Sequence, residues 1–308
     1  MTALPVLVAS DLDATLIYSA RSMLLRVPDD QAPSMLCVEV HDRKPVAFMT
    51  LAAANAVHRL NELGALMPVT TRTMAQYQRV HLPGPQPEYA VCANGGRLLH
   101  RGREDEDYTA EIAATLATSS APLEEVLEHV TTVAQLGQRA GFVKSYRSAE
   151  RLFCYIVLHT AQRPDDWFAQ LAQPCADLGW EVTSQGRKIY LVPNGLTKAD
   201  AVAAVAERTG AGTVLAAGDS LLDLSLLTFA DAAIRPRHGE LHAVGWSRPN
   251  VTVTNAEGIL GGEEIAAWML HAVAEAPRGS SRAEVGQEES ITTAVHLTGA
   301  DAFVGAGG

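Results

Sequence analysis

The sequence lacks any long apolar run, which argues against a membrane-spanning protein. Although 47% of its 308 residues are hydrophobic, no stretch approaches the roughly 20 consecutive apolar residues that a spanning helix needs. The first residues, Met-Thr-Ala-Leu-Pro, also lack the basic start and cleavable apolar segment of a secretion signal. We therefore expect a soluble cytoplasmic protein with no membrane partner.

Basic residues are scarce relative to acidic ones. The chain has 24 lysines and arginines against 35 aspartates and glutamates, which gives a formal net charge of −11. Such a surface repels polyanions, so no nucleic-acid partner is expected. Cysteines are scarce as well, because Cys37, Cys92, Cys154 and Cys175 lie far apart and form no Cys-x-x-Cys pair. Buried free thiols are therefore expected in place of disulfides or a zinc site.

Two domains are the simplest expectation for a chain too long for one ordinary hydrophobic core. In residues 1–82 and 193–275, short apolar segments alternate with amphipathic ones, the pattern of an α/β core with a mainly parallel sheet. Residues 83–192 begin with Pro-Gly-Pro-Gln-Pro and indicate a self-contained α+β domain inserted into that core. Residues 276–308 are rich in Gly, Ala, Ser and Glu without sustained periodicity, which predicts a mostly disordered tail.

The same patterns predict individual elements. In the core we expect strands at 4–9, 65–69, 213–217, 232–234 and 251–253, a hairpin within 34–49, and helices at 51–63, 198–209, 221–229 and 263–274. In the inserted domain we expect helices at 123–140 and 165–178, a strand at 152–159 and a hairpin within 180–192.

Two aspartates, Asp11 and Asp13, follow the first predicted strand in the segment Asp-Leu-Asp-Ala-Thr. Side chains at this spacing project to the same side of an extended chain, so both carboxylates can converge on one ligand. The structural alternative is that these aspartates and Thr15 only cap a turn after the strand. The motif indicates a functional site only if residues elsewhere in the chain complete it.

Lys198 and Thr70 are candidates to complete the site. Thr197 and Asp200 have the spacing of a capping pair, which places Lys198 in the first turn of a helix. A cation there is unfavourable unless an anion lies opposite, and helix N-termini and lysines both bind phosphate. Thr70 carries a hydroxyl at the carboxyl end of a strand, where ligands of open α/β sheets bind. The alternatives are a lysine extended into solvent and a threonine that caps the following helix together with Thr71.

A second acidic pair, Asp219 and Asp223, follows the strand expected at 213–217, after a turn at Gly218. Mg²⁺ prefers oxygen ligands and takes one or two carboxylates together with water and substrate phosphate. A second acidic pair opposite the first suits this ion, although Asp223 at a helix start could serve only the helix dipole.

Together these motifs resemble those of the haloacid dehalogenase (HAD) superfamily of phosphohydrolases. They are Asp11-x-Asp13-x-Thr15, Thr70 in Thr-Thr-Arg, Lys198, and Gly218-Asp219-x-x-x-Asp223, in the order that the family requires. An insertion between the Thr70 and Lys198 motifs is similar to the cap of the Cof-type and sucrose-phosphatase-like branch. The resemblance covers residues 4–270 approximately, and it implies a Rossmann-like core with an inserted cap domain.

The resemblance also implies a mechanism. Asp11 would be the nucleophile that forms an aspartyl-phosphate, and Asp13 would act as general acid and then as general base. Thr70 and Lys198 would hold the phosphoryl oxygens, and the cap would close over the site and select the substrate. The cofactor Mg²⁺ would be held by Asp11, by the Asp13 carbonyl, by Asp219 and by the nearby Asp223.

Further residues are expected to bind the substrate. They are Thr15, Thr71, Arg72, Asn94, Arg187 and Lys188. Arg187 and Lys188, on the hairpin expected within 180–192, could meet a second anionic or hydroxyl-rich group, with a solvated basic turn as the alternative. Asn94 would lie at the hinge near the catalytic face, although Asn-Gly is also a common turn. Arg72 could contact phosphate or pair with a surface acid.

Two residues depart from the family's motifs. Ala14 replaces a usual glycine, and Leu222 replaces a usual asparagine before the second acid. We expect an altered rate or substrate preference more than inactivity. The implied function is a Mg²⁺-dependent phosphomonoester hydrolase, monomeric or homodimeric, whose substrate is a small phosphorylated metabolite, most simply a phosphosugar. The alternatives are a phosphomutase of the same fold and a catalytically weak ligand-binding or regulatory protein.

Overall fold

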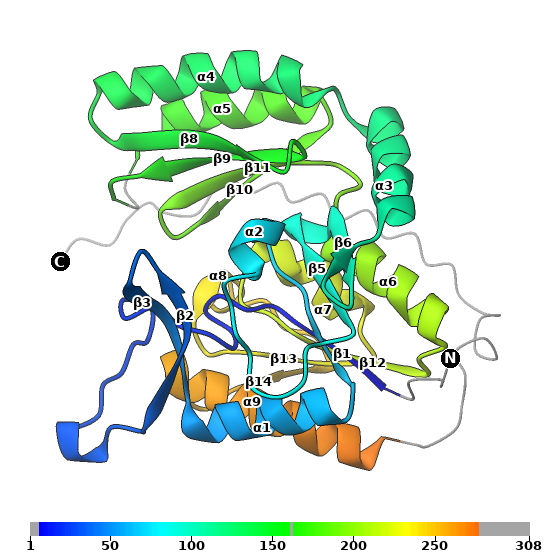
Figure 1. Ribbon diagram of the computed structural model, residues 1–308. Coiled ribbons are helices and arrows are strands. Elements are labelled where there is room, and N and C mark those ends of the chain that lie inside the picture. The colour runs from blue at the N-terminus through cyan, green and yellow to red at the C-terminus, as the bar shows by residue number, and fades with distance from the viewer. Residues whose placement is uncertain (1–5, 161–162, 277–308) are drawn as a thin grey trace.

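The computed structural model describes residues 6–160 and 163–276 and has two parts (Figure 1). The lower part in the figure contains a five-stranded sheet, and the upper part contains a separate four-stranded sheet. The upper sheet is formed by residues that lie in the chain between two strands of the lower one. The predicted α/β fold, a parallel core with an α+β insertion, is therefore confirmed.

The core sheet is parallel, with the strand order β14-β13-β12-β1-β4. The bounds are β1 (Val6–Ser10), β4 (Leu66–Pro68), β12 (Thr213–Ala217), β13 (Ala232–Arg235) and β14 (Val251–Val253). Every residue of β1 is buried, as is typical of a central parallel strand with helices on both faces.

Two layers of helices cover this sheet. Helices α1 (Leu51–Glu62) and α9 (Gly258–Glu275) share a hydrophobic cluster with Val6 and Val8 of β1. Leu7 and Ala9, which project to the opposite face, belong to a second cluster that includes side chains of α6 (Lys198–Thr209). The first turn of α1 is capped by Thr50, whose hydroxyl accepts from the Ala53 amide at 3.0 Å.

The upper sheet is antiparallel, with the order β10-β11-β9-β8. Its bounds are β8 (Val143–Ala149), β9 (Phe153–Leu158), β10 (Trp180–Gln185) and β11 (Lys188–Pro193). Helices α4 (Leu123–Arg139) and α5 (Asp165–Asp177) cover the outer face of this sheet, so its other face looks toward the core (Figure 1). A further helix, α3 (Glu106–Ser119), lies beside the passage from the core into this part.

Two smaller sheets flank the core. The predicted hairpin is β2 (Met35–His41) paired with β3 (Lys44–Thr50). Strands β5 (Tyr89–Cys92), β6 (Arg97–His100) and β7 (Arg103–Glu104) form the other sheet, and Val91 of β5 bridges Val69 just after β4. The domain boundaries at residues 83 and 192 stay a prediction.

Most predicted elements are confirmed, and several details of the predictions were wrong. Helix α9 begins at Gly258 instead of 263, because Gly261 and Gly262, which weaken a helix in isolation, pack closely here. The helix expected at 221–229 is a 3₁₀ turn, η3 (Leu221–Asp223), followed by α7 (Leu224–Phe229). The polar strand β8 and helix α3 were not predicted.

The remaining expectations concern cysteines, membranes and the tail. All four cysteines are free, but Cys37 is exposed on β2, so its predicted burial was wrong. Burial raises the pKa of the Cys175 thiol to about 11, which keeps it protonated at neutral pH.

Among the described residues, no helix has both the length and the apolar character to cross a bilayer. The predicted tail lies outside the described residues, except for Ala276.

Candidate active site

Three neighbouring strands of the core sheet end at the candidate site. Asp11 follows β1 directly, Thr70 comes two residues after β4, and Asp219 comes two residues after β12. Because β12, β1 and β4 are adjacent and parallel, their carboxyl ends meet at one edge of the sheet. The fold therefore gathers residues that are more than two hundred positions apart in the chain.

Lys198 lies between two carboxylates of this site. Helix α6 begins at Lys198 because the Thr197 hydroxyl accepts from the Asp200 amide at 3.1 Å and caps the helix. The buried Nζ of Lys198 donates to Asp11 Oδ1 at 2.6 Å and to Asp223 Oδ1 at 2.5 Å. Burial by itself would lower the pKa of Lys198, but these two carboxylates raise it above its ordinary value. Lys198 is therefore charged at neutral pH.

The carboxylates of the site are short of positive charge. Burial raises the pKa of Asp11 to about 7; Lys198 opposes this rise, and Asp223 adds to it. Burial, followed by Asp223 and Asp11, raises the pKa of Asp219 well above its ordinary value. The single positive charge of Lys198 therefore offsets the negative charge of Asp11, Asp219 and Asp223 only in part.

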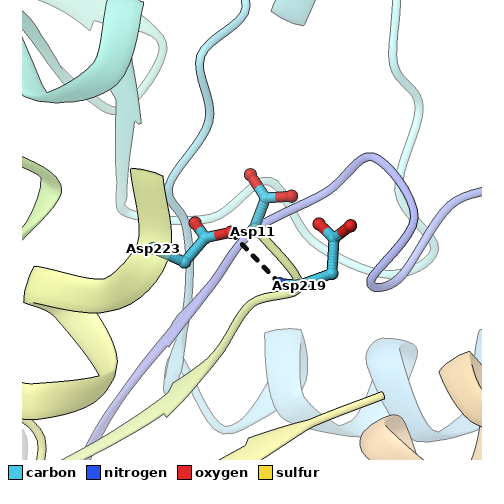
Figure 2. A group of neighbouring side chains, drawn as sticks. All are labelled: Asp11, Asp219 and Asp223. Carbon is cyan, nitrogen blue, oxygen red and sulfur yellow. Dashed lines mark hydrogen bonds between the residues drawn. The ribbon is translucent and has the colours of Figure 1, made fainter. Parts of the chain in front are cut away.

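Asp223 uses both of its oxygens within the protein. Its Oδ1 accepts from Lys198, and its Oδ2 accepts from the amides of Asp219 (3.1 Å) and Ser220 (2.9 Å) and from the Ser220 hydroxyl (2.8 Å). Figure 2 shows the bond from the Asp219 amide as a dashed line. A side chain at Gly218 would place its Cβ 2.4 Å from the Asp223 Cβ, which explains the glycine. Asp223 therefore orients Lys198 and the Asp219 loop.

Asp11 and Asp219 have oxygens left for a cation. Within the described part of the chain, the buried Oδ1 of Asp219 has no hydrogen-bond partner. One oxygen each from Asp11, Asp219 and Asp223 lies within 4.8 Å of the others, and Figure 2 shows the Asp11 and Asp219 carboxylates pointing the same way. An unpartnered buried oxygen among acids of raised pKa is stabilised by a divalent cation. These residues therefore fit a metal ion.

A short helix that the sequence analysis missed supports Asp219. Gly239, the first residue of α8 (Gly239–Ala243), has a φ of +81°, and a Cβ there would lie 2.8 Å from Asp219 Oδ2. The Leu241 amide donates to the Asp219 carbonyl at 3.1 Å. Burial also raises the pKa of Glu240, on the same helix, to about 7. Helix α8 thus fixes Asp219 in addition to Asp223.

Asp13 is held by Arg72, for which the sequence left two roles open, contact with phosphate or pairing with an acid. Arg72 donates from Nε to Asp13 Oδ2 at 2.6 Å and from Nη2 to Asp13 Oδ1 at 2.8 Å. Its third donor, Nη1, reaches Glu39 Oε2 at 2.8 Å, and Arg79 Nε binds the other oxygen of Glu39 at 3.1 Å. The side chain of Glu39 is 1% exposed, whereas that of Asp13 is 52% exposed. A buried carboxylate on the β2–β3 hairpin therefore anchors the arginine that orients Asp13.

The two departures from the family's motifs have local explanations. Ala14 adopts a φ of 60°, a conformation that favours glycine. Its carbonyl accepts from the Tyr18 hydroxyl at 3.0 Å and from Nε2 of His238 at 2.9 Å, which stabilises the turn. Leu222 is buried in the larger hydrophobic cluster, so it contributes packing where an asparagine would contribute a polar group.

A cavity of about 790 Å³ lies between the two parts of the molecule. The part with the five-stranded sheet forms its core wall, which includes Asp11, Asp13, Thr71, Arg72, Lys198 and Asp219. The part with the four-stranded sheet forms its cap wall, which includes Arg187 and Lys188. Lys188 Nζ donates to the Tyr190 hydroxyl at 3.3 Å and lies 5.5 Å from the centre of the Tyr155 ring. Tyr190 raises the pKa of Lys188 above its ordinary value against the opposing effect of burial, and Asp13 contributes to the rise.

Three other predicted site residues are buried beside the cavity and do not line it. Thr70 accepts from the Arg72 amide at 3.1 Å, and the buried hydroxyl of Thr15 has no partner among the described residues. Asn94 donates from its amide to the Leu196 carbonyl at 3.1 Å. The neighbouring Gly95 packs so closely that a Cβ would lie 2.1 Å from the Thr197 carbonyl oxygen. This Asn-Gly segment therefore positions the start of α6.

Comparisons with known proteins find similarity by structure only. No family model and no curated protein matches the chain. Similar solved structures include a sucrose-phosphatase from Synechocystis in complex with sucrose and phosphate, at 17% identity and a TM-score of 0.57, covering 88% of this chain and 99% of that one. A trehalose-6-phosphate phosphatase related protein, at 14% identity, has a TM-score of 0.52 and coverages of 87% and 99%.

A haloacid dehalogenase-like hydrolase from Bacteroides thetaiotaomicron is similar over the same extent. It has 16% identity and a TM-score of 0.51, and the alignment covers 87% of this chain and 98% of that one. Each alignment spans both the parallel core and the inserted sheet, because so little of either chain is left out. The chain therefore has the fold of the haloacid dehalogenase-like phosphatases, a Rossmann-like core with an inserted cap.

Proposed function

We propose that this protein is a Mg²⁺-dependent phosphomonoester hydrolase that acts on a small phosphate ester, most simply a phosphosugar, in the cytoplasm. The observation that carries the proposal is the convergence of Asp11, Lys198 and Asp219 at one end of a cavity large enough for such a substrate. The fold adds support, since similar structures are described as sucrose-phosphatase and as a sugar phosphatase of HAD subclass IIB.

Asp11 is the nucleophile in this proposal. Lys198 binds its Oδ1, which leaves Oδ2 to attack phosphorus. The new bond between Asp11 and phosphorus forms as the bond from phosphorus to the ester oxygen breaks, and an aspartyl-phosphate results. In this proposal Lys198 and Thr70 would hold the phosphoryl oxygens: Lys198 lines the cavity, and Thr70 lies buried beside it at the same edge of the sheet as Asp11.

Asp13 moves the protons in both steps. It gives a proton to the departing ester oxygen and then takes one from the water that attacks the aspartyl-phosphate, so that inorganic phosphate leaves and both aspartates are regenerated. Its exposed position at the cavity wall gives it access to both the ester oxygen and water. Arg72 keeps the Asp13 carboxylate in place through two hydrogen bonds.

The metal would be Mg²⁺, held by Asp11 and Asp219, with the Asp13 carbonyl as a further ligand. When bound, it supplies positive charge that offsets the repulsion between an anionic nucleophile and an anionic phosphate. Asp223 would act on this site through its bonds to Lys198 and to the Asp219 amide. The cap wall, with Arg187 and Lys188, would meet the part of the substrate beyond the phosphate, near Thr71 and Arg72.

A phosphate-release assay with Asp11→Asn tests this proposal. Wild-type protein with Mg²⁺ is expected to release phosphate from at least one sugar phosphate, EDTA is expected to stop the reaction, and Asp11→Asn is expected to be inactive. Asp42→Asn, at the exposed turn of the β2–β3 hairpin, is the matched control and should retain full activity. Equal release by wild type and Asp11→Asn would refute the mechanism. Release that requires an added bisphosphate would indicate a phosphomutase, and no turnover across a broad panel would favour a binding protein.

A further inference from the structure

The charged side chains on the described cap wall of the cavity are both cations. The cap residues that line it include the cations Arg187 and Lys188 and no carboxylate. This is unusual in a chain whose formal net charge is −11. The wall also carries aromatic side chains, Tyr155 and Tyr190, whose hydroxyls can donate hydrogen bonds. Whatever binds there meets hydrogen-bond donors and positive charge.

The pairing of β9 with β11 places Lys188 and the two tyrosines on one face of the four-stranded sheet. Tyr155 pairs with Tyr190 and Val157 pairs with Lys188, so all of them project from the face that α4 and α5 leave uncovered. Lys188 is held there by the Tyr190 hydroxyl and lies over both tyrosine rings, 5.5 Å and 5.7 Å from their centres. This restraint distinguishes Lys188 from an ordinary solvated lysine.

Among the described residues these two cap cations form no ion pair, in contrast to the buried core cations. Arg72 and Arg79 bind Glu39, and Lys198 binds Asp11. Within residues 6–160 and 163–276, no carboxylate forms an ion pair with Arg187 or Lys188. The buried cations at the core end of the cavity are thus each ion-paired, whereas, in the part of the chain that the structure describes, the two exposed cations at the cap end are not.

We propose that the substrate carries a second anionic group, a carboxylate or a second phosphate, that binds Lys188 and Arg187 at the cap end while its phosphate ester lies at Asp11. This inference rests on the proposed function and narrows its substrate class from neutral phosphosugars to acidic ones. Neutral sugars present hydroxyls that need acceptors as well as donors, and among the described side chains of the cap wall the acceptors are Gln185 and the tyrosine hydroxyls. A carboxylate or phosphate accepts from all of these groups and neutralises both cations.

The test compares matched esters that differ in one charged group. Sorbitol 6-phosphate and 6-phosphogluconate are open-chain and differ only in a terminal alcohol against a carboxylate. Fructose 6-phosphate and fructose 1,6-bisphosphate test a second phosphate in the same way. For at least one pair, the acidic member is expected to have a KM about tenfold lower, the effect of one charge-assisted contact at a partly exposed site. The pair that shows this difference identifies which anion is recognised.

Lys188→Met tests whether Lys188 causes the difference in KM between the acidic and the neutral ester. It removes the charge and keeps an apolar stem over the tyrosines, so the KM ratio within the pair is expected to fall to about 1. Lys144→Met, on the exposed side of β8 and outside the cavity, removes the same charge from the same sheet and should leave the ratio unchanged. Equal KM values within both pairs, or a ratio that survives Lys188→Met, would overturn the inference.

Binding to Asp11→Asn separates this inference from the proposed function. Calorimetric titration of that variant with 6-phosphogluconate and sorbitol 6-phosphate, and with the fructose pair, measures recognition without turnover. A tenfold preference for an acidic member that Lys188→Met abolishes supports the inference even if wild-type protein hydrolyses neither ester. Equal affinities within both pairs refute it even if wild-type protein is an active phosphatase.

Discussion

Replacement of Glu39 by glutamine is expected to impair catalysis without touching the reacting atoms. Glu39 binds Arg72 at 2.8 Å and Arg79 at 3.1 Å, and Arg72 holds both oxygens of Asp13. A glutamine has nearly the same shape, but it has no charge and only one acceptor oxygen. One of the two arginines then faces an amide NH₂ group, and the anchor of Arg72 is weakened.

The size of the effect follows from burial. Loss of one partner of a fully buried pair costs about 3–5 kcal/mol. Here the cost is reduced to about 2 kcal/mol, because glutamine retains one acceptor and the Arg79 side chain, 34% exposed, can bind water instead. For a chain of this size that corresponds to a fall in Tm of roughly 5 °C. A misplaced Asp13 adds a loss of about 10- to 100-fold in kcat.

The assay separates a catalytic effect from a structural one by the leaving group. A sugar alkoxide needs a proton from Asp13 as it departs, whereas p-nitrophenolate leaves without one. Glu39→Gln is therefore expected to lower the rate of leaving-group release in the first turnover, before the shared hydrolysis of the aspartyl-phosphate, by about 10- to 100-fold for a sugar phosphate and by much less for p-nitrophenyl phosphate. Asp13→Asn should show the same dependence on leaving group in a stronger form.

Glu62→Gln provides the control for the substitution itself. Glu62 also binds an arginine, at 2.6 Å, but it lies on the exposed face of α1. Its replacement is expected to change neither kcat nor Tm. If Glu39→Gln slowed the first-turnover release of both leaving groups equally, the carboxylate would be only structural, and the link from Glu39 through Arg72 to Asp13 would be refuted.

Three further predictions concern the metal site and its loops. Because the raised pKa values of Asp11 and Asp219 favour their protonated forms, the stability that Asp11 contributes in EDTA is present below about pH 4 and is lost as pH rises through about 7, and the contribution of Asp219 is likewise lost as pH rises. Calorimetry should therefore show a larger Mg²⁺-induced rise in Tm at pH 8 than at pH 5, and an equal rise at both would contradict this. Gly239→Ala should raise the Mg²⁺ concentration needed for half-maximal activity about tenfold by displacing Asp219, whereas Gly245→Ala, at a similar φ with no atom within 4 Å, should not. Ala14→Gly should keep activity and change the free energy of unfolding by less than about 1 kcal/mol in a urea titration, because relief of a positive φ is offset by the greater freedom of glycine in the unfolded chain.

The parallel core could be predicted from sequence because its signals are local. Buried strands such as β1 are continuous apolar runs. Thr50 and Thr197 each cap the helix that begins at the next residue. The convergence of Asp11 and Asp219 then follows from the rule that parallel strands share a carboxyl edge. The start of α9 could not be predicted in this way, since its glycines are tolerated only where they pack against distant residues.

Glu39 shows why the rest of the site could not be predicted from the sequence. Strict alternation along β2 would bury Val40 on the same face as Val38 and leave Glu39 in solvent. The pairing of β2 with β3 is irregular on both sides of Glu39, and such a bulge turns the strand so that Val38 and Glu39 are each 1% exposed while Val40 is 56% exposed. A bulge is set by the partner strand and by the arginines that require a buried carboxylate, and neither is visible in the local pattern of β2. The residue that anchors Arg72 could therefore be found only once the strands and the two arginines were placed together in space.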